Sequence, residues 1–337
     1  MAVSMQPTMR DIAEAAGVSQ PTVSLALRND ARVAPATRKQ VLAVAEQLGY
    51  RPNPMVAALM AQRRKPNSNA TRGTLAVLYV GPRNRSLWHN DSVMKLYAAG
   101  LHSRAAELGY EVDDIRADAP DMDADRLAGV LQARGITGLF MAPLPSTGES
   151  VSLDWSRFAV ATLGHSWHER RLHRSTADQY GNLRLAWAEL RRRGHQRIGL
   201  AVTDGVDERL DRQWSAAFLT EQRLLPRKLQ VPPFLPNVLD VMDFKTWVER
   251  YRPEAILFHE QPVAELLHGL TPSVRDGITL VDLGIVPGNN ECGVDPDRAA
   301  IAAAAVDLIV AQLNRNERGL PASPKTVSIR GHFFPGV

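Results

Sequence analysis

Residues 8–59 read TMRDIAEAAGVSQPTVSLALRNDARVAPATRKQVLAVAEQLGYRPNPMVAAL, and this stretch decides the fold of the N-terminal part of the chain. One apolar helix face is predicted where small or apolar residues recur three or four positions apart: Met9, Ile12, Ala13 and Ala16. Thr8 precedes this helix as its expected N-cap. Gly17 is expected to end it, because glycine readily takes the left-handed conformation that follows many helices.

A second and a third helix are predicted in the same stretch. Ser19 is expected to cap the second, with Val23, Ala26 and Leu27 on its buried side. Its opposite side carries side chains that can hydrogen-bond to DNA: Gln20, Thr22, Ser24 and Arg28. The third helix is expected over residues 35–48, ending at Gly49, with four apolar residues packed on the other two helices: Val41, Leu42, Ala45 and Leu48.

An ordered set of residues within this stretch carries a family resemblance: Thr8, Asp11-Ile12-Ala13, Ala16-Gly17-Val18-Ser19, Thr22-Val23-Ser24, Val33, Thr37-Arg38 and Gly49-Tyr50-Arg51-Pro52-Asn53. The stretch resembles the N-terminal DNA-binding domain of the LacI/GalR family of bacterial transcription regulators. A three-helix bundle without a DNA role is the alternative, but it leaves the polar face of the second helix unexplained. The resemblance implies a homodimer that binds double-stranded operator DNA.

The resemblance also implies which residues contact DNA. Gln20 and Pro21 match the family's two base-reading positions, and Leu25 is expected to make an apolar contact with a base. The remaining contacts of this domain are expected mainly with phosphates: Ser19, Thr22, Ser24, Arg28, Thr37, Tyr50 and Asn53. Thr8 is also expected to contact DNA. In the hinge, Val56 would pack against the partner's hinge helix and Leu59 would wedge into the minor groove. A plain linker is the alternative for the hinge.

Charge and composition agree with this interpretation. Residues 1–65 contain nine Lys or Arg and four Asp or Glu residues, whereas the whole chain of 337 residues has a net charge of only +4. Positive charge is therefore concentrated where phosphates would be met. The single cysteine, Cys292, excludes an internal disulfide, and we expect it to be an inert residue in or near the core. With no signal segment and no membrane-length apolar run, the expected location is the cytoplasm, with no membrane partner.

From Thr74 onward, short apolar strands alternate with amphipathic helices. Strands are predicted over Leu75–Val80, Tyr110–Ile115, Gly138–Ala142, Ala159–Leu163, Arg197–Val202, Ala255–Phe258 and Thr279–Leu283, and helices over Val93–Leu108, Leu183–Arg193 and Arg298–Asn314. Such alternation predicts parallel sheets with right-handed crossovers.

The expected fold is thus an all-α helix-turn-helix domain followed by an α/β effector domain. Looser matches, such as Arg193-Gly194-His195 and Asn316-Glu317-Arg318-Gly319, resemble the family's two-lobed, periplasmic-binding-protein-like domain. The expected domains are 1–53 for DNA binding, 54–72 for the hinge helix and linker, and 73–337 for effector binding and dimerisation.

Nine residues are candidates for effector contacts. They are aromatic, charged or imidazole side chains near predicted strand ends or at family positions: Trp88, His89, His165, Asp178, Arg209, Arg212, Trp214, His259 and Asp282. Either Arg209 or Arg212 is expected to face the ligand. Arg212 stands where the family has glycine, and His259-Glu260-Gln261 replaces a usual Asn-Asp pair. The expected effector is a small molecule, a sugar or sugar derivative, although these departures argue against a standard sugar inducer.

Two other classes of function are alternatives to a ligand-responsive DNA-binding regulator. The first is a small-molecule-binding module that responds to a protein partner and has lost DNA binding. The second is an enzyme on a similar two-lobed fold. Phosphate-loop, nucleophile-elbow and zinc-protease motifs are absent from the sequence, and the histidines at 165, 168 and 173 lack metal-ligand spacing. The sequence therefore predicts a repressor with no catalytic residues, no metal and no cofactor, and it leaves open whether the effector weakens or strengthens DNA binding.

Overall fold

The computed structural model describes residues 7–27, 30, 32–48, 50, 73–80, 91–119, 121–144, 151–167, 171–259, 261–288 and 291–336. Six of the predicted site residues lie outside this part of the chain: Arg28, Asn53, Val56, Leu59, Trp88 and His89.

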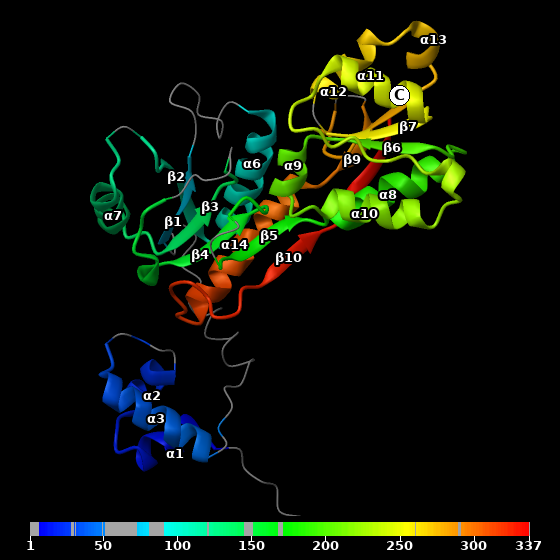
Figure 1. Cartoon of the computed structure of the whole chain (residues 1–337). Coiled ribbons are helices and arrows are strands. Elements are labelled where there is room, and N and C mark those ends of the chain that lie inside the picture. The colour runs from blue at the N-terminus through cyan, green and yellow to red at the C-terminus, as the bar shows by residue number, and fades with distance from the viewer. Residues whose placement is uncertain are drawn as a thin grey trace, which may run out of the picture.

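The N-terminal unit consists of α1 (Met9–Ala15), α2 (Gln20–Leu27) and α3 (Pro35–Gln47), drawn in blue in Figure 1. Thr8 caps α1 as predicted, because its side chain accepts from Asp11 N while the Asp11 carboxylate accepts from Thr8 N. Gly17 has a φ of 64°, which confirms the left-handed turn between the first two helices. The core of the unit lies where the three helices meet, around Ile12, Val23, Val41 and Ala45.

Two of the predicted core positions in α3 are wrong. Leu42 is 47% exposed, and Leu48, the C-cap, is 40% exposed. Val41 and Ala45 are buried, and they lie one helical turn apart on the same face. Leu42 is rotated by about 100° from Val41 on a helix of 3.6 residues per turn, so it lies off that face.

The first lobe is a six-stranded parallel sheet in the order β10-β5-β4-β3-β1-β2. Its strands are β1 (Gly73–Tyr79), β2 (Tyr110–Arg116), β3 (Gly138–Met141), β4 (Ala159–Leu163), β5 (His173–Ala177) and β10 (Thr326–Ile329). The helices α6 (Ser92–Glu107) and α14 (Arg298–Asn314) cover one face (Figure 1). The other face packs against α7 (Ala124–Ala133) and the 3₁₀ turn η1 (Trp155–Arg157).

The second lobe is a five-stranded sheet in the order β11-β9-β8-β7-β6, in which only β11 is antiparallel. Its strands are β6 (Ile198–Ala201), β7 (Ala255–Phe258), β8 (Thr279–Asp282), β9 (Cys292–Asp295) and β11 (His332–Pro335). One face packs on α8 (Gln179–Arg192) and α10 (Gln213–Arg223), and the other on α11 (Val241–Tyr251) and α12 (Gln261–Leu266). The shorter elements are α9 (Asp204–Arg209), η2 (Arg227–Leu229), η3 (Leu267–Gly269) and α13 (Pro272–Arg275).

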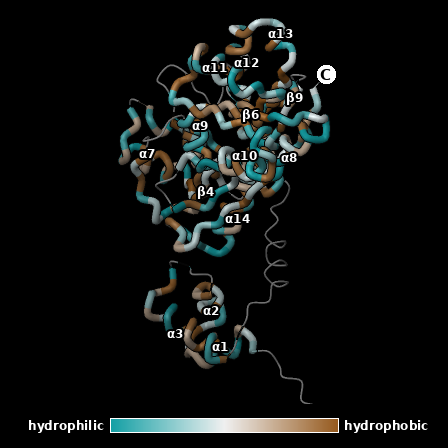
Figure 2. Tube along the Cα trace, turned by 45° about the vertical axis from the view of Figure 1, so that its right-hand side comes forward, coloured by the Kyte–Doolittle hydropathy of each residue, from teal (hydrophilic) through white to brown (hydrophobic). Residues whose placement is uncertain are grey.

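The α/β class and the two lobes are confirmed, but the sequence analysis missed β5, β9, β10 and β11. These strands carry polar residues, glycine or proline in place of an apolar run: HRSTA, CGVD, TVSI and HFFP. The helix predicted from Leu183 begins earlier, at Gln179, because Asp178 caps it by accepting from Gly181 N. In Figure 2 brown, hydrophobic stretches of the trace run through the interior of the larger domain, for example at β4 and β6.

The chain passes between the lobes after β5, after β9 and after β10. The crossings after β5 and after β10 are tied together, because Asp178 N donates to Ile329 O at 2.7 Å and Gly331 N donates to the side-chain oxygen of Asn182 at 2.8 Å. Asn182 is fully buried, so the crossing segments form one hydrogen-bonded joint. Within the described residues, no helix is long and apolar enough to span a membrane.

Candidate DNA-binding surface and effector cavity

The start of α2 presents an exposed polar surface. Ser19 Oγ accepts from Thr22 N at 3.3 Å and shares a 2.7 Å hydrogen bond with Thr22 Oγ1, which makes Ser19 the N-cap of α2 as predicted. Gln20 and Pro21 follow in the first turn and are exposed. The structure therefore leaves the two residues expected to contact bases accessible at a helix N-terminus, the end that enters the major groove in helix-turn-helix proteins.

Two other predicted contacts are also part of the core. Leu25 and Tyr50 are half-buried and pack against the buried cluster of the three helices. Arg38, one of the residues that carry the family resemblance, donates from Nη2 to Asp30 O at 2.7 Å and to Val33 O at 3.1 Å. Arg38 therefore ties α3 to Asp30 and Val33, in the segment that precedes it.

A cavity of about 360 Å³ lies between the two lobes of the larger domain. It opens at the carboxyl ends of the strands, where ligands bind in open α/β sheets. The first lobe contributes residues after β1, β3, β4 and β5 together with one side of α6, and the second lobe contributes residues after β7 and β8 together with α9 and α10.

Four of the predicted effector residues line this cavity: His165, Arg209, Trp214 and His259. Three others do not, and each makes a hydrogen bond or ion pair elsewhere. Asp178 caps α8, Asp282 accepts from His259 Nδ1 at 3.0 Å, and Arg212 pairs with Asp204 at 2.7 Å. Of the two arginines left open by the sequence, Arg209 is the one on the cavity wall.

Residues 8–53 match the family model described as "Bacterial regulatory proteins, lacI family". The N-terminal unit is therefore a DNA-binding domain of the LacI type. The whole chain is 28% identical over 332 residues to the HTH-type transcriptional regulator PtxS of Pseudomonas plecoglossicida, covering 94% of this chain and 91% of that protein. These matches identify a helix-turn-helix transcription regulator, as the resemblance implied.

Solved structures share the fold over nearly the whole chain. A transcriptional regulator CelR–cellobiose complex matches with a TM-score of 0.56 and 16% identity, covering 98% of this chain and 99% of the other. A Lac repressor dimer bound to operator and the anti-inducer ONPF matches with a TM-score of 0.51 and 18% identity, covering 98% of both chains. At these identities the match supports the architecture, a DNA-binding unit followed by two lobes.

His165 connects the two lobes of this chain. Arg174 Nη1, from the first lobe, lies 3.0 Å from His165 Nδ1, and because a guanidinium only donates, Nδ1 must accept. His165 Nε2 then carries the proton, and it lies 3.1 Å from the side-chain amide of Gln213, in the second lobe. We assign the Gln213 amide with its oxygen toward the ring, since only an oxygen can accept from Nε2–H.

His259 is held in place from the second lobe. Its Nδ1 lies 3.0 Å from Asp282 Oδ1, which also accepts from Gly284 N at 2.7 Å. Its ring meets Trp214 edge to face, with ring centroids 5.3 Å apart. A carboxylate partner on Nδ1 fixes the orientation of the imidazole, so Asp282 positions His259 and does not itself line the cavity.

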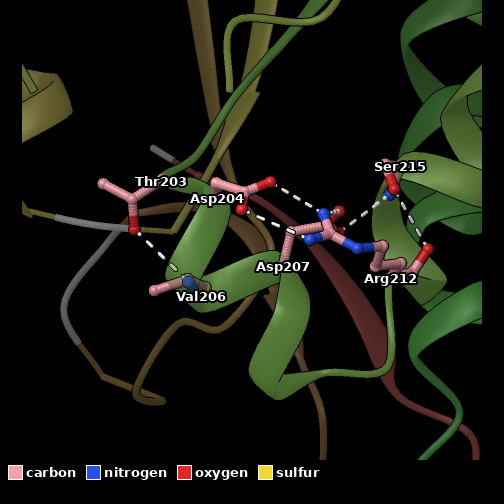
Figure 3. A network of polar contacts seen from close by, with 6 residues as sticks. All are labelled: Thr203, Asp204, Val206, Asp207, Arg212 and Ser215. Carbon is pink, nitrogen blue, oxygen red and sulfur yellow. Dashed lines mark hydrogen bonds and ion pairs between the residues drawn. The ribbon is translucent and has the colours of Figure 1, made fainter. Parts of the chain in front are cut away.

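Arg212 belongs to a polar network that joins α9 to α10 (Figure 3). Its Nη1 lies 2.7 Å from Asp204 Oδ1 and 3.7 Å from Asp207 Oδ2, and Asp207 Oδ1 accepts from Ser215 N at 3.1 Å. The hydrogen bond from Arg212 lowers the pKa of the Asp204 carboxyl. Asp207 has no exposed surface, so the guanidinium compensates a buried carboxylate.

We expect Arg212→Gln to lower the free energy of unfolding, because it leaves the buried Asp207 carboxylate without its neighbouring cation. The loss should be smaller than that of breaking a fully buried pair, because Arg212 is itself 51% exposed. Urea unfolding of the full chain measures this. The matched control is Arg126→Gln, which breaks an exposed pair with Asp121 and should change stability by no more than about 0.5 kcal/mol. Equal stability of the two variants would contradict the structural role of Arg212.

Several cavity residues were missed by the sequence analysis, notably Arg298, Tyr97 and Gln179. Arg298 opens α14 and is only 5% exposed. Burial raises the pKa of Tyr97, and the nearby Arg298 charge opposes that shift. No pattern along the chain marked Gln179, because β5 and the start of α8 were both missed. Arg298 was predicted as the start of a helix, but β9 before it was not.

Proposed function

We propose that this chain represses transcription by binding a palindromic operator as a homodimer, and that a small-molecule effector in the cavity between the lobes controls this binding. The observation that carries the proposal is the combination, in one chain, of an exposed polar surface at the start of α2 and a cavity lined by residues of both lobes of the larger domain. The dimeric operator complex of the structurally similar Lac repressor supports the assembly.

The effector would act by favouring one arrangement of the lobes. The cavity wall comes from both lobes, and His165 already bonds across them to Gln213. A ligand that contacts both walls stabilises the lobe arrangement that it fits better. The fraction of molecules in that arrangement then rises, to an extent set by the ratio of the ligand's affinities for the two arrangements. In a dimer, that shift changes the spacing of the two DNA-binding units and hence the affinity for a two-part operator.

The proposed base contacts can be tested by selecting operators from a random duplex library with the full chain. We expect a palindromic consensus for the wild type and an altered base preference within each half-site for Gln20→Ala, because each bidentate base contact contributes about 1–3 kcal/mol of discrimination. Gln47→Ala is the control, since Gln47 is exposed at the far end of α3. An unchanged consensus for Gln20→Ala would remove Gln20 from the reading surface, and failure to select any operator would overturn the proposed function.

A further inference from the structure

Positive charge gathers at the end of the second lobe that lies opposite the effector cavity. The cavity is lined by residues that follow β7 and β8, whereas Arg197 and Glu254 directly precede the parallel strands β6 and β7. Three segments form this end of the lobe, which we call the basic surface: 189–197, 221–228 and 249–254. They contain nine Lys or Arg residues and four Asp or Glu residues, a net charge of +5 in a chain whose total is +4.

Hydrogen bonds join the three segments into one surface. Arg197 Nη1 donates to Lys228 O at 2.6 Å, and Arg197 Nε donates to Tyr251 O at 2.9 Å. Glu254 Oε2 accepts from Gln196 N at 2.6 Å. The helices α8 and α10, which carry the first two segments, also lie side by side in Figure 1. The charges therefore belong to one continuous patch and not to three separate runs of sequence.

The carboxylates of the basic surface are already occupied. Glu189 accepts from Arg192 and Arg193, and these hydrogen bonds lower the pKa of its carboxyl to about 2. The other three carboxylates accept from a backbone amide or pair with cations outside the three segments. Seven cations of the basic surface consequently form no ion pair with any described residue: Arg191, Arg197, Arg223, Arg227, Lys228, Arg250 and Arg252.

Three of these seven cations are held in place by groups that leave their charge uncompensated. Arg191 Nη1 donates to His195 O at 3.0 Å, and Arg197 donates to the carbonyls named above. The guanidinium of Arg250 lies 5.2 Å from the centroid of the Tyr251 ring. The other four are exposed to solvent: Arg223, Arg227, Lys228 and Arg252. An anion that binds this surface thus meets charges of which several are already ordered, so less side-chain entropy is lost on binding.

We propose that the basic surface binds the phosphate backbone of double-stranded DNA without reading its sequence, as a DNA contact separate from the one at α2. Six of the seven unpaired cations are arginines, whose forked donors match phosphate oxygens. Among the described residues of the three segments, Leu224 is the one large hydrophobic side chain that is exposed. A single leucine is too little for the apolar centre of a protein interface, which favours DNA over an acidic protein. The chain can then hold one duplex segment at α2 and another at the basic surface.

The test uses the full chain carrying Ile12→Asp, because Ile12 is fully buried among the three N-terminal helices and its replacement removes the folded surface around α2. Three neutral substitutions are added to this background: Arg223→Gln, Arg227→Gln and Lys228→Gln. Fluorescence anisotropy follows the binding of a short non-operator duplex over a range of salt concentrations. We expect the affinity at low salt to fall roughly tenfold or more. The slope of log K against log salt should fall by about two to three, because each lost phosphate contact removes about 0.9.

The matched control adds a different set of three substitutions to the same background: Arg126→Gln, Arg134→Gln and Arg275→Gln. These arginines pair with carboxylates elsewhere in the larger domain, so their loss changes the net charge equally and should leave duplex affinity and salt slope nearly unchanged. The thermal unfolding transition shows that both triple variants remain folded.

Equal loss of duplex affinity in the two triple variants would reduce the effect to net charge, and no loss in either would place the contact elsewhere; both results overturn the proposal. Tighter binding of polyglutamate than of duplex at the same salt concentration would assign the surface to an acidic protein and overturn it as well. The proposed function is tested separately, because this measurement needs neither a folded reading surface nor an effector. Failure to select an operator with the wild type leaves the basic surface standing, and an inert basic surface leaves the operator assignment standing.

Discussion

Replacing Ile12 with aspartate is expected to abolish specific operator binding while leaving the effector cavity intact. Ile12 has no exposed surface and lies at the centre of the cluster that joins α1, α2 and α3. A carboxylate buried there without a partner costs several kcal/mol. A three-helix unit of this size buries too little apolar surface to absorb that loss. We therefore expect the unit to unfold and specific affinity to fall by roughly a thousandfold or more, to the non-specific level.

Leu42→Asp is the matched control for Ile12→Asp. Leu42 lies on α3 and is 47% exposed, so the same change of charge there should leave the three helices folded. Both variants reduce the positive charge of the unit by the same amount, so the difference between them isolates the effect of burial. Gel-shift titration and the ligand affinity of each variant decide the matter. If Ile12→Asp and Leu42→Asp bind operator equally well, the core assignment of the unit is wrong.

The N-terminal unit was predictable because its signals are local. Thr8, Gly17 and Ser19 each take up a cap or turn that depends only on neighbouring residues, and all three were predicted correctly. The errors at Leu42 and Leu48 arise because several apolar residues compete for one narrow face of α3. Hydrophobicity alone does not choose among them, whereas packing against α1 and α2 does.

In the larger domain, strands with apolar runs were predicted and strands without them were missed. β5 is buried in the sheet although it contains His173, Ser175 and Thr176, so tertiary contacts override its composition. His173 is satisfied by a partner that is remote in sequence, since its Nδ1 accepts from Lys325 N at 3.0 Å. A search for patterns along the chain cannot detect hydrogen bonds between residues that are so far apart in sequence.

The cavity residues were predicted only in part, because some of them reach the cavity through contacts between elements that are distant in sequence. His165, Arg209, Trp214 and His259 were proposed from strand ends and spacing, and they do line it. Arg298 was seen only as the start of a helix, because its role depends on β8 and α14 meeting in space. The distinction between Arg209 and Arg212 depends on Asp204 and Asp207, which only the fold brings to Arg212.

Gly100→Ala is expected to destabilise the effector domain and to weaken ligand binding together. A Cβ built on Gly100, in α6, would lie 2.3 Å from Ala299 O and 2.7 Å from Ala299 Cα, both backbone atoms of α14. No side-chain rotation relieves such a contact, so the two helices must move apart. Overpacking of this kind costs about 1–3 kcal/mol, which lowers Tm by roughly 2–4 °C for each kcal/mol. Since Ala299 follows Arg298, the shift also displaces the guanidinium from the cavity wall.

The control for Gly100→Ala is Gly129→Ala. Gly129 lies in α7, and a Cβ there meets nothing within 4 Å. Because alanine is favoured over glycine inside a helix by about 0.5–1 kcal/mol, Gly129→Ala should stabilise the domain and leave ligand affinity unchanged. The same propensity gain applies to Gly100→Ala, so an opposite sign there isolates the clash with α14. Scanning calorimetry measures the stability of both variants, and titration with a ligand that stabilises the wild type in a thermal-shift screen measures their affinities. A Gly100→Ala variant as stable as Gly129→Ala, with unaltered ligand affinity, would show that α14 can retreat without moving Arg298.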